Sequence, residues 1–221
     1  MTDKGFIFDL DGVVVDTARY HYKAWNRLAT QLGFVFTQEH NELLKGVSRK
    51  KSLDILLNIG NITASEDQKQ QWMEAKNQEY LEYIQKMTPD EILPNVPYIL
   101  KHLKEEGHHI ALGSASKNAV QILQKIMLFD AFDVIVDGTH VSKAKPDPEV
   151  FLKAAQEMNI RPENCVVFED AVAGIQAAKA ANMYAIGIGK KEVLIAADEV
   201  FPDFTTMTPQ FLGAIWNVPK V

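Results

Sequence analysis

Short apolar runs and helical patterns alternate along most of the chain. The apolar runs predict buried strands, at residues 6–9, 109–113, 134–136, 165–168 and 185–188, with a weaker one at 200–201. In the segments between these strands apolar residues recur every three to four positions, which predicts helices over residues 96–106, 119–127, 145–158 and 174–182. Strands that alternate with helices are typical of an α/β protein with a mostly parallel sheet, covered by helices on both faces.

One long segment, residues 17–88, contains helical patterns and no strand pattern. Within it, Ser48 and Ser65 precede periodic segments and are expected to be N-caps. A block of about 70 helical residues inside an alternating chain suggests an insertion rather than part of one sheet. We therefore expect a discontinuous α/β core domain, residues 1–16 and 89–221, and an inserted helical domain, residues 17–88.

Composition narrows the class of protein further. The chain has 221 residues, 47% of them hydrophobic and 24% charged, which suits a globular protein with a sizeable core. Its formal net charge of -6 disfavours a nucleic-acid partner, because nucleic-acid binding favours a basic surface. No apolar run approaches the roughly 20 residues of a membrane span and no signal-peptide pattern opens the chain, so a cytoplasmic protein is expected. The single cysteine, Cys165, lies in an apolar run and is expected to be a buried strand residue rather than a nucleophile.

Two acids, Asp9 and Asp11, follow the first apolar run and precede Gly12. In an extended chain alternate residues share a face, so both carboxylates would point to one place while Leu10 turns into the core. Holding two carboxylates together at the end of a buried strand is costly unless a cation or a proton lies between them. Solvated turn residues are the alternative, because Asp-Gly is a common turn pair.

Three other segments carry polar residues that bear on this choice. Ser114 follows the second predicted strand, and Lys145 precedes a proline between the third and the fourth. Glu169 and Asp170 follow the fourth. In a parallel sheet, ligands bind beyond the carboxyl ends of the strands. The sequence therefore brings acids, a hydroxyl group and a cation to one edge of the sheet.

These residue types suit phosphoryl transfer. Asp9, Glu169 and Asp170 offer the hard oxygen ligands that Mg²⁺ prefers, and the lack of cysteine or histidine at these strand ends disfavours zinc. Beside Mg²⁺, a carboxylate can attack a phosphoryl group and carry it as an aspartyl-phosphate. The nearby hydroxyl group and lysine would bind the oxygens of the transferring group, and Asp11 would exchange a proton with the leaving or attacking oxygen.

The four segments resemble the sequence motifs of the haloacid dehalogenase-like hydrolase superfamily. The matching residues are Asp9-Leu10-Asp11-Gly12 with Asp16-Thr17, Ser114 after an apolar strand, Lys145-Pro146, and Glu169-Asp170 followed by Gly174-Ile175. The resemblance covers the whole chain and implies a Rossmann-like parallel core with an inserted helical cap. It implies that Asp9 is the nucleophile, that Asp11 is the second acid of phosphatases and phosphomutases, and that Ser114 and Lys145 are catalytic. It also implies a metal site formed by Asp9, Glu169, Asp170 and the backbone carbonyl of Asp11.

Further residues, implied to bind substrate, resemble those of the β-phosphoglucomutases within that superfamily. They are Thr17, His21, Trp25, Lys45, Gly46, Val47, Arg49, Ser52, Lys76, Ala115, Ser116, Lys117 and Asn118. Members of that family pass a phosphoryl group from the enzyme to a β-glucose phosphate and take the other phosphate back from the resulting bisphosphate. By this resemblance Arg49 would hold the non-reacting phosphate, and His21 with Lys76 would couple cap closure to the placing of Asp11. One departure is Ala171, where many relatives carry serine.

Three functions remain open from the sequence. The first is a mutase that converts β-glucose 1-phosphate to glucose 6-phosphate, and Arg49 favours it, because arginine binds phosphate in a bidentate way and Ser48 would start a helix beside it. The second is a Mg²⁺-dependent sugar-phosphate phosphatase with the same core, and the third is a non-catalytic phosphosugar-binding protein. In plainer alternatives Lys45 and Arg49 belong to a solvated cationic helix face, and His21 and Trp25 only pack. A small sugar phosphate is the expected partner, bound by a monomer, with no nucleic acid and no membrane.

Overall fold

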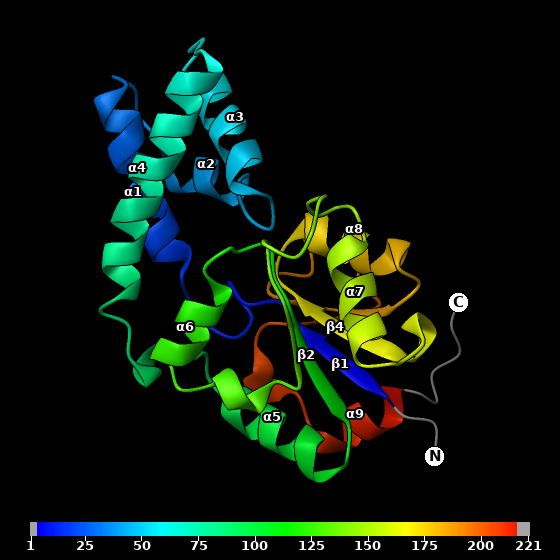
Figure 1. Cartoon of the computed structure of the whole chain (residues 1–221). Coiled ribbons are helices and arrows are strands. Elements are labelled where there is room, and N and C mark those ends of the chain that lie inside the picture. Colours follow the sequence, from blue (N-terminus) through cyan, green and yellow to red (C-terminus); the bar gives the residue numbers. More distant parts are fainter. Residues whose placement is uncertain (1–3, 216–221) are drawn as a thin grey trace.

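The computed structural model describes residues 4–215 and contains a six-stranded sheet in which every pair of neighbouring strands is parallel. The strands are β1 (Gly5–Phe8), β2 (His109–Gly113), β3 (Val134–Val136), β4 (Cys165–Glu169), β5 (Tyr184–Ile188) and β6 (Glu199–Phe201). They lie side by side in the order β3-β2-β1-β4-β5-β6, so the first segment of the chain occupies the middle of the sheet (Figure 1). This arrangement confirms the predicted fold class.

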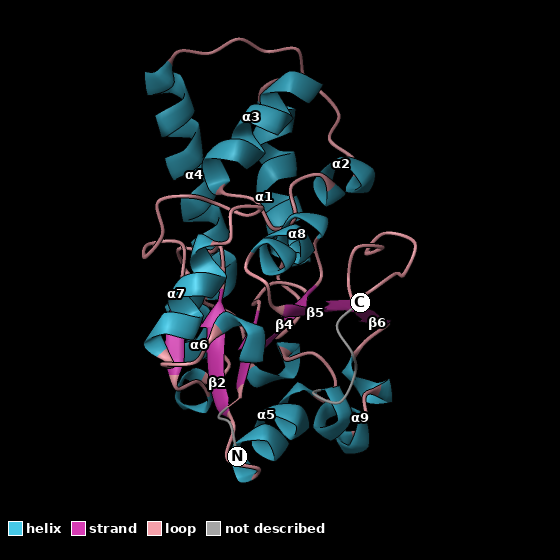
Figure 2. Ribbon diagram, turned by 90° about the vertical axis from the view of Figure 1, so that its right-hand side faces the viewer, coloured by secondary structure: helices cyan, strands magenta, loops and turns pink. Residues whose placement is uncertain are grey.

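Alternate side chains of the strands belong to two separate layers of the core, with helices on both faces of the sheet (Figure 2). Phe6 and Phe8 pack in the layer that contains α5 (Val96–Glu105), α6 (Ala119–Lys125) and the short α9 (Pro209–Ala214). Ile7 packs in the layer that contains α7 (Glu149–Glu157) and α8 (Val172–Ala180). Because both faces are covered, β1 is buried along its whole length.

Four further helices follow β1 and lie beyond the carboxyl ends of the strands (Figure 1). These cap helices are α1 (Ala18–Gln31), α2 (Gln38–Glu42), α3 (Arg49–Ile59) and α4 (Glu66–Ile84). They pack around an apolar cluster of their own, which includes Trp25, Phe36 and Leu56. The cap helices therefore have a core of their own, although Ala24 of α1 and Tyr80 and Ile84 of α4 join the layer that contains Phe6 and Phe8.

The two chain segments that join the cap helices to the sheet lie side by side. Asp16 N donates to Glu91 O at 3.4 Å, and Leu93 N donates to Val14 O at 3.0 Å. On α1 the Tyr20 hydroxyl donates to Glu91 Oε1 at 2.8 Å. The chain thus leaves the sheet and returns to it at one place.

The element boundaries agree closely with those expected from the sequence. Ser48 and Ser65 each accept a first-turn backbone N–H, at 3.3 Å and 3.2 Å, so both are N-caps as predicted. The helix expected from residue 145 begins later, at Glu149, because two prolines follow and the residue before a proline disfavours helical geometry. The short elements carry too few residues for a periodic pattern and were not predicted: α9 and the 3₁₀ turns Pro89–Glu91, Phe129–Ala131, Pro162–Asn164 and Phe204–Thr206.

Two expectations drawn from composition can also be compared with the structure. Cys165 is fully buried in β4, as predicted. Within residues 4–215, no helix combines the length and the apolar character needed to cross a membrane. The Cys165 side chain packs in the same layer of the core as α7 and α8.

Candidate active site

Asp9 and Asp11 lie just beyond the carboxyl end of β1, at the centre of the sheet. Asp9 continues the pairing with β4, since its N–H donates to a β4 carbonyl at 3.0 Å. Leu10 is fully buried, so it turns away from the two acids into the core as predicted. The chain then turns at Gly12, where φ is 80° and an added Cβ would lie 2.2 Å from Asp170 Oδ2. A glycine at this turn lets the two acidic motifs approach each other.

Lys145 joins the acids through buried ion pairs. Its Nζ lies 2.6 Å from Asp9 Oδ1 and 2.8 Å from Glu169 Oε2, and it donates to Gly113 O at 3.1 Å. Burial alone would lower the pKa of Lys145, but the two carboxylates outweigh burial and raise the pKa above its ordinary value. The lysine therefore stays charged. Residues from the start, the middle and the later part of the chain meet at one edge of the sheet, as predicted.

Asp9, Glu169 and Asp170 form an acidic cluster, in which one carboxylate oxygen from each lies within 4.8 Å of the others. Burial, then Glu169 and Asp9, raises the pKa of Asp170 well above its ordinary value, and burial, then Asp9, raises the pKa of Glu169. One lysine neutralises only part of this charge, so the ionised cluster needs a further cation. Hard carboxylate oxygens in this number suit a divalent cation such as Mg²⁺. The Asp11 side chain is not part of the cluster, and a metal contact through its backbone carbonyl stays a prediction.

Asp11 has a different environment. It accepts a hydrogen bond from the hydroxyl group of Thr17, the residue just before α1. Burial, then the neighbouring Asp9, raises the pKa of Asp11 to about 6, although the bond from Thr17 and the charges of Lys145 and Lys76 oppose the rise. A carboxyl group with a pKa near neutrality both gives and takes a proton readily. Asp11 therefore suits the acid–base role expected of it.

On the cap side, α1 and α4 meet through a lysine–histidine pair. Lys76 Nζ lies 3.0 Å from His21 Nδ1 and 4.7 Å from the centre of the Trp25 ring. Burial, then Lys76 and Arg49, lowers the pKa of His21 well below its ordinary value, so the imidazole is neutral. Burial, then Arg49, lowers the pKa of Lys76 to about 7. The positive charge of Lys76 lowers the pKa of Asp11, so a residue of the cap helices influences the protonation of the proposed acid–base group.

A cavity of about 500 Å³ lies between the cap helices and the strand ends. Most predicted site residues line it, namely Asp9, Asp11, His21, Trp25, Lys45, Gly46, Val47, Arg49, Ser52, Lys76, Ala115, Ser116, Lys117, Asn118, Lys145 and Asp170. Thr17, Ser114 and Glu169 are fully buried behind the wall of the cavity, each in contact with a lining residue. Ser114 Oγ accepts from Ser116 N at 3.1 Å. Its contact with a transferring phosphoryl group stays a prediction.

Other residues that the sequence did not single out also line the cavity. They include Asn41, Gln70, Met73, Glu74 and Tyr80 on the cap helices, and Gly138, Val141, Ser142, Lys143 and Ala144 in the loop after β3. The cap residues lie on helix faces that only tertiary packing turns toward the cavity, so no sequence signal marks them. The loop residues had one available signal, because they directly precede the Lys145-Pro146 motif.

Three contacts bring the cap helices against the strand ends on both sides of the cavity. Lys45 Nζ lies 3.6 Å from Asp170 Oδ2, and Asn118 Nδ2 donates to Asn77 Oδ1 at 3.1 Å. In the loop between α2 and α3, Gly46 has a φ of 70°, and an added Cβ would lie 2.8 Å from the methyl group of the alanine that follows Asp170. The glycine and the alanine together allow this close approach of the cap to the acidic cluster.

The fold and the site define the class of protein to which the chain belongs. The chain is a member of the haloacid dehalogenase-like hydrolases, whose family model matches residues 4–182. The matched residues include all four motifs on which the sequence resemblance was based.

Within that class the chain is similar to β-phosphoglucomutases. It is 41% identical to the β-phosphoglucomutase of Bacillus subtilis (strain 168) over 220 residues, which cover 99% of this chain and 97% of that protein. Its structure matches a crystal structure of β-phosphoglucomutase from Clostridium difficile with a TM-score of 0.93 and 40% identity, over 98% of each chain. A phosphorylated carbohydrates phosphatase from Thermotoga maritima is 33% identical over 180 residues, 80% of this chain and 81% of that protein.

We expect Thr17→Val to raise the pKa of Asp11 above about 6, because it removes a hydrogen bond that favours the carboxylate. The measurement is a pH titration of the Asp11 carboxyl carbon by NMR, without divalent cations. Thr30→Val is the matched control, since Thr30 lies on the exposed side of α1 and donates to Asn26 O at 2.8 Å. An Asp11 pKa that stayed the same or fell in Thr17→Val would contradict this account of the contact.

Proposed function

We propose that this protein acts as a β-phosphoglucomutase, which interconverts β-D-glucose 1-phosphate and D-glucose 6-phosphate. The main observation behind the proposal is that two cationic side chains line one cavity from different domains. Lys145 lies beside Asp9 on the sheet, and Arg49 is the first residue of α3 on the cap. A hexose bisphosphate has two phosphate groups and needs two such places. Similarity over nearly the full length to the β-phosphoglucomutases of two bacteria supports the same activity.

In the first half of the reaction Asp9 is the nucleophile. A carboxylate oxygen of Asp9 bonds to one phosphorus atom of β-glucose 1,6-bisphosphate, and the bond from that phosphorus to the sugar oxygen breaks. Asp11 gives its proton to the leaving sugar oxygen. Lys145 orients the attacking carboxylate and offsets negative charge on the phosphoryl oxygens. The products are a phosphorylated Asp9 and a glucose monophosphate.

In the second half the phosphoryl group moves from Asp9 back to a sugar. Asp11 takes the proton of a hydroxyl group of the other glucose monophosphate, and that oxygen attacks the phosphorus on Asp9. This restores the bisphosphate and the free Asp9 carboxylate. The restored bisphosphate must then turn, before the next first half, so that its other phosphate faces Asp9. Because Arg49 lies on the cap helices and Asp9 on the sheet, this turn requires the cap to open and close.

The start of α3 suits the phosphate that is not reacting. Ser48 caps the helix, so the backbone N–H groups of the first turn and the positive end of the helix dipole face the same region as Arg49. Gly46 and Val47 line the cavity beside this helix start. A phosphate there would meet both a guanidinium group and unpaired N–H groups.

Asp9, Glu169, Asp170 and the backbone carbonyl of Asp11 would hold Mg²⁺, which when bound supplies positive charge to the transferring phosphoryl group. We place the limits of the cap at residues 17–88, since the crossing segments on either side lie together. One chain supplies enough charged residues around the cavity to bind a small sugar phosphate, so the proposed activity requires no more than a monomer, and the composition supports a cytoplasmic location.

A sugar-phosphate phosphatase is the second candidate, because the relative from Thermotoga maritima carries a phosphatase name and shares most of the chain. The two functions differ in whether water or a sugar hydroxyl group attacks the phosphorylated Asp9. Lys45 and Asn77 join the cap to the sheet domain at two places around the cavity, and such contacts favour the exclusion of water from phosphorylated Asp9.

A coupled assay distinguishes the two candidates. With Mg²⁺ and a trace of glucose 1,6-bisphosphate, we expect the β anomer of glucose 1-phosphate to give glucose 6-phosphate without net phosphate release, and the α anomer to give none. Both products are measured in the same reaction. Release of one phosphate per substrate consumed would exclude the mutase in favour of the phosphatase.

We expect Arg49→Ala to lower kcat/KM for the sugar phosphate by about 10- to 100-fold, since it removes charged hydrogen bonds to one phosphate. Phosphorylation of Asp9 by acetyl phosphate, which has a single phosphate, should stay close to the wild-type rate. Lys51→Ala, an exposed neighbour on α3, is the control. Equal loss of both activities in Arg49→Ala would contradict the assignment of Arg49 to the non-reacting phosphate.

Mg²⁺ is expected to stabilise the folded protein, because it neutralises the buried acidic cluster. At about 100 times its Kd, Mg²⁺ should add about 2.7 kcal/mol to the free energy of unfolding, measured by thermal or urea denaturation. Asp170→Asn should abolish most of this gain, whereas Asp130→Asn, at an exposed site, should keep it. A gain of equal size in Asp170→Asn would show that Mg²⁺ binds elsewhere.

A further inference from the structure

The loop at residues 137–148, between β3 and α7, forms part of the cavity wall and contains Lys145. Gly138, Val141, Ser142, Lys143 and Ala144 of this loop line the cavity. The loop contains no helix or strand. Its internal backbone hydrogen bonds are two turns, from His140 N to Asp137 O and from Asp147 N to Ala144 O, both at 3.0 Å, and neither includes residues 141–143. Contacts that fix the position of this loop therefore also affect the position of Lys145.

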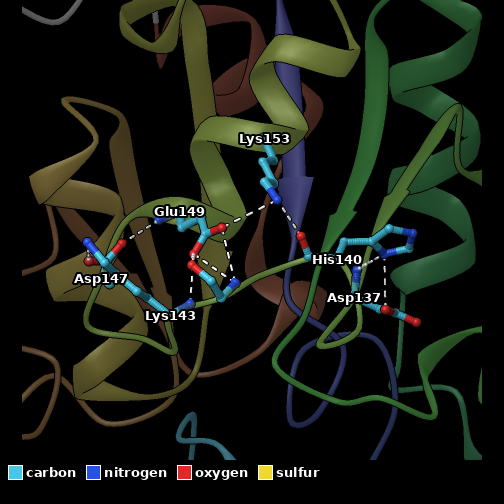
Figure 3. A network of polar contacts seen from close by, with 7 residues as sticks. Asp137, His140, Lys143, Asp147, Glu149 and Lys153 are labelled. Carbon is cyan, nitrogen blue, oxygen red and sulfur yellow. Dashed lines mark hydrogen bonds and ion pairs between the residues drawn. The ribbon is translucent and has the colours of Figure 1, made fainter.

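The carboxylate of Glu149, the first residue of α7, holds the middle of this loop (Figure 3). Glu149 Oε2 accepts from Lys143 N at 2.7 Å, from Ser142 Oγ at 2.9 Å and from Ser142 N at 3.0 Å. Two consecutive backbone N–H groups and a hydroxyl group therefore converge on one carboxylate. Hydrogen bonds to an ionised acceptor are stronger than those between neutral groups.

A second residue of α7 holds the earlier part of the loop. Lys153 lies one helical turn after Glu149, and its Nζ is 3.3 Å from Glu149 Oε1. The same Nζ donates to the backbone carbonyl of His140 (Figure 3). We call Glu149 and Lys153 the α7 clasp. Through the clasp, α7 is bonded to Ser142 and Lys143 of the cavity wall and to His140 earlier in the same loop.

The clasp stays formed over the pH range in which enzymes are assayed. Backbone hydrogen bonds from Ser142 and Lys143 lower the pKa of Glu149 to about 2. The carboxylate is therefore ionised well below neutrality and accepts all of its bonds. At the other end of the segment, Lys145 is bonded to Asp9 and Glu169, so the loop is held from both sides of the Lys145-Pro146 motif.

We propose that Glu149 is a positioning residue for phosphoryl transfer, which sets the place of the 142–145 segment and thereby of Lys145 beside Asp9. The inference rests on the proposed function only for the identity of the reaction. Glutamine at position 149 keeps the size of the side chain, but its amide offers one oxygen and turns an NH₂ group toward the N–H donors of the loop. The segment would then shift, and a displacement of about 1 Å at a reacting group can cost about 100-fold in rate.

The central experiment measures phosphorylation of Asp9 by acetyl phosphate in a single turnover, with Mg²⁺ present. We expect Glu149→Gln to lower this rate by about 10-fold or more, and the KM for the sugar phosphate to stay within about twofold, since Arg49 is untouched. Glu149→Asp keeps an ionised acceptor and should recover part of the lost rate. Glu157→Gln, at an exposed position on the same helix, should phosphorylate like the wild type.

Hydrogen exchange provides a readout that does not depend on activity. In Glu149→Gln we expect faster amide exchange in residues 138–145, with β4 and the cap helices exchanging as in the wild type. If Glu149→Gln does not fold, Lys153→Met tests the same clasp from its other residue. Faster loop exchange with an unchanged rate of Asp9 phosphorylation would overturn the proposal, and so would unchanged exchange.

The failure of this inference and that of the proposed function have different signatures. A wild-type protein that phosphorylates Asp9 but releases phosphate instead of isomerising glucose phosphate contradicts the mutase alone. The comparison of the Glu149 variants at the phosphorylation step remains valid in that case. Equal phosphorylation by wild type and Glu149→Gln contradicts the positioning role alone.

Discussion

The buried ion pairs of Lys145 with Asp9 and Glu169 are the interaction on which the rest of the site depends. Three carboxylates gathered at the end of a sheet repel one another, and burial removes the water that would weaken this repulsion. Lys145 supplies one positive charge at 2.6 Å and 2.8 Å and leaves the cluster acidic enough to attract a divalent cation. The same geometry keeps the Asp9 carboxylate in one orientation. Removing either side of such a buried pair leaves an uncompensated charge, so binding and catalysis share one electrostatic arrangement.

The order of the strands makes this arrangement possible. Because β1 lies between β2 and β4, residues that follow these three strands become neighbours although they come from the start, the middle and the later part of the chain. The cap helices then bring a second set of charges from above, including Arg49 and the pair formed by His21 and Lys76. In the proposed function the sheet domain supplies the groups that transfer the phosphoryl group, and the cap supplies Arg49 for the other phosphate. Asp11, the acid proposed to exchange a proton, has a pKa that Asp9 and Lys145 of the sheet domain and Lys76 of the cap all influence.

Much of this could be predicted from the sequence, for identifiable reasons. Buried parallel strands are continuous apolar runs, so their positions and the polar residues at their ends were visible, and Ser48 and Ser65 marked helix starts by their chemistry. What could not be predicted depends on tertiary packing. Asn41 and Gln70 line the cavity from the cap helices without belonging to any motif, and the hydrogen bond between Asn118 and Asn77 depends on how the cap meets the sheet domain. The contact of Glu149 with the loop before Lys145 needs the fold of that loop, which no periodicity encodes.

The paired crossing between the sheet and the cap helices has a consequence for how such proteins diversify. The two crossing segments are bonded to each other, through Asp16 with Glu91 and Leu93 with Val14, so the chain enters and leaves the inserted cap at one place in the fold. Substitutions in the cap helices can change the shape of the cavity while the strand order and the charges at the strand ends stay the same. New substrate preferences can thus evolve through the cap while Asp9 and its surroundings stay unchanged.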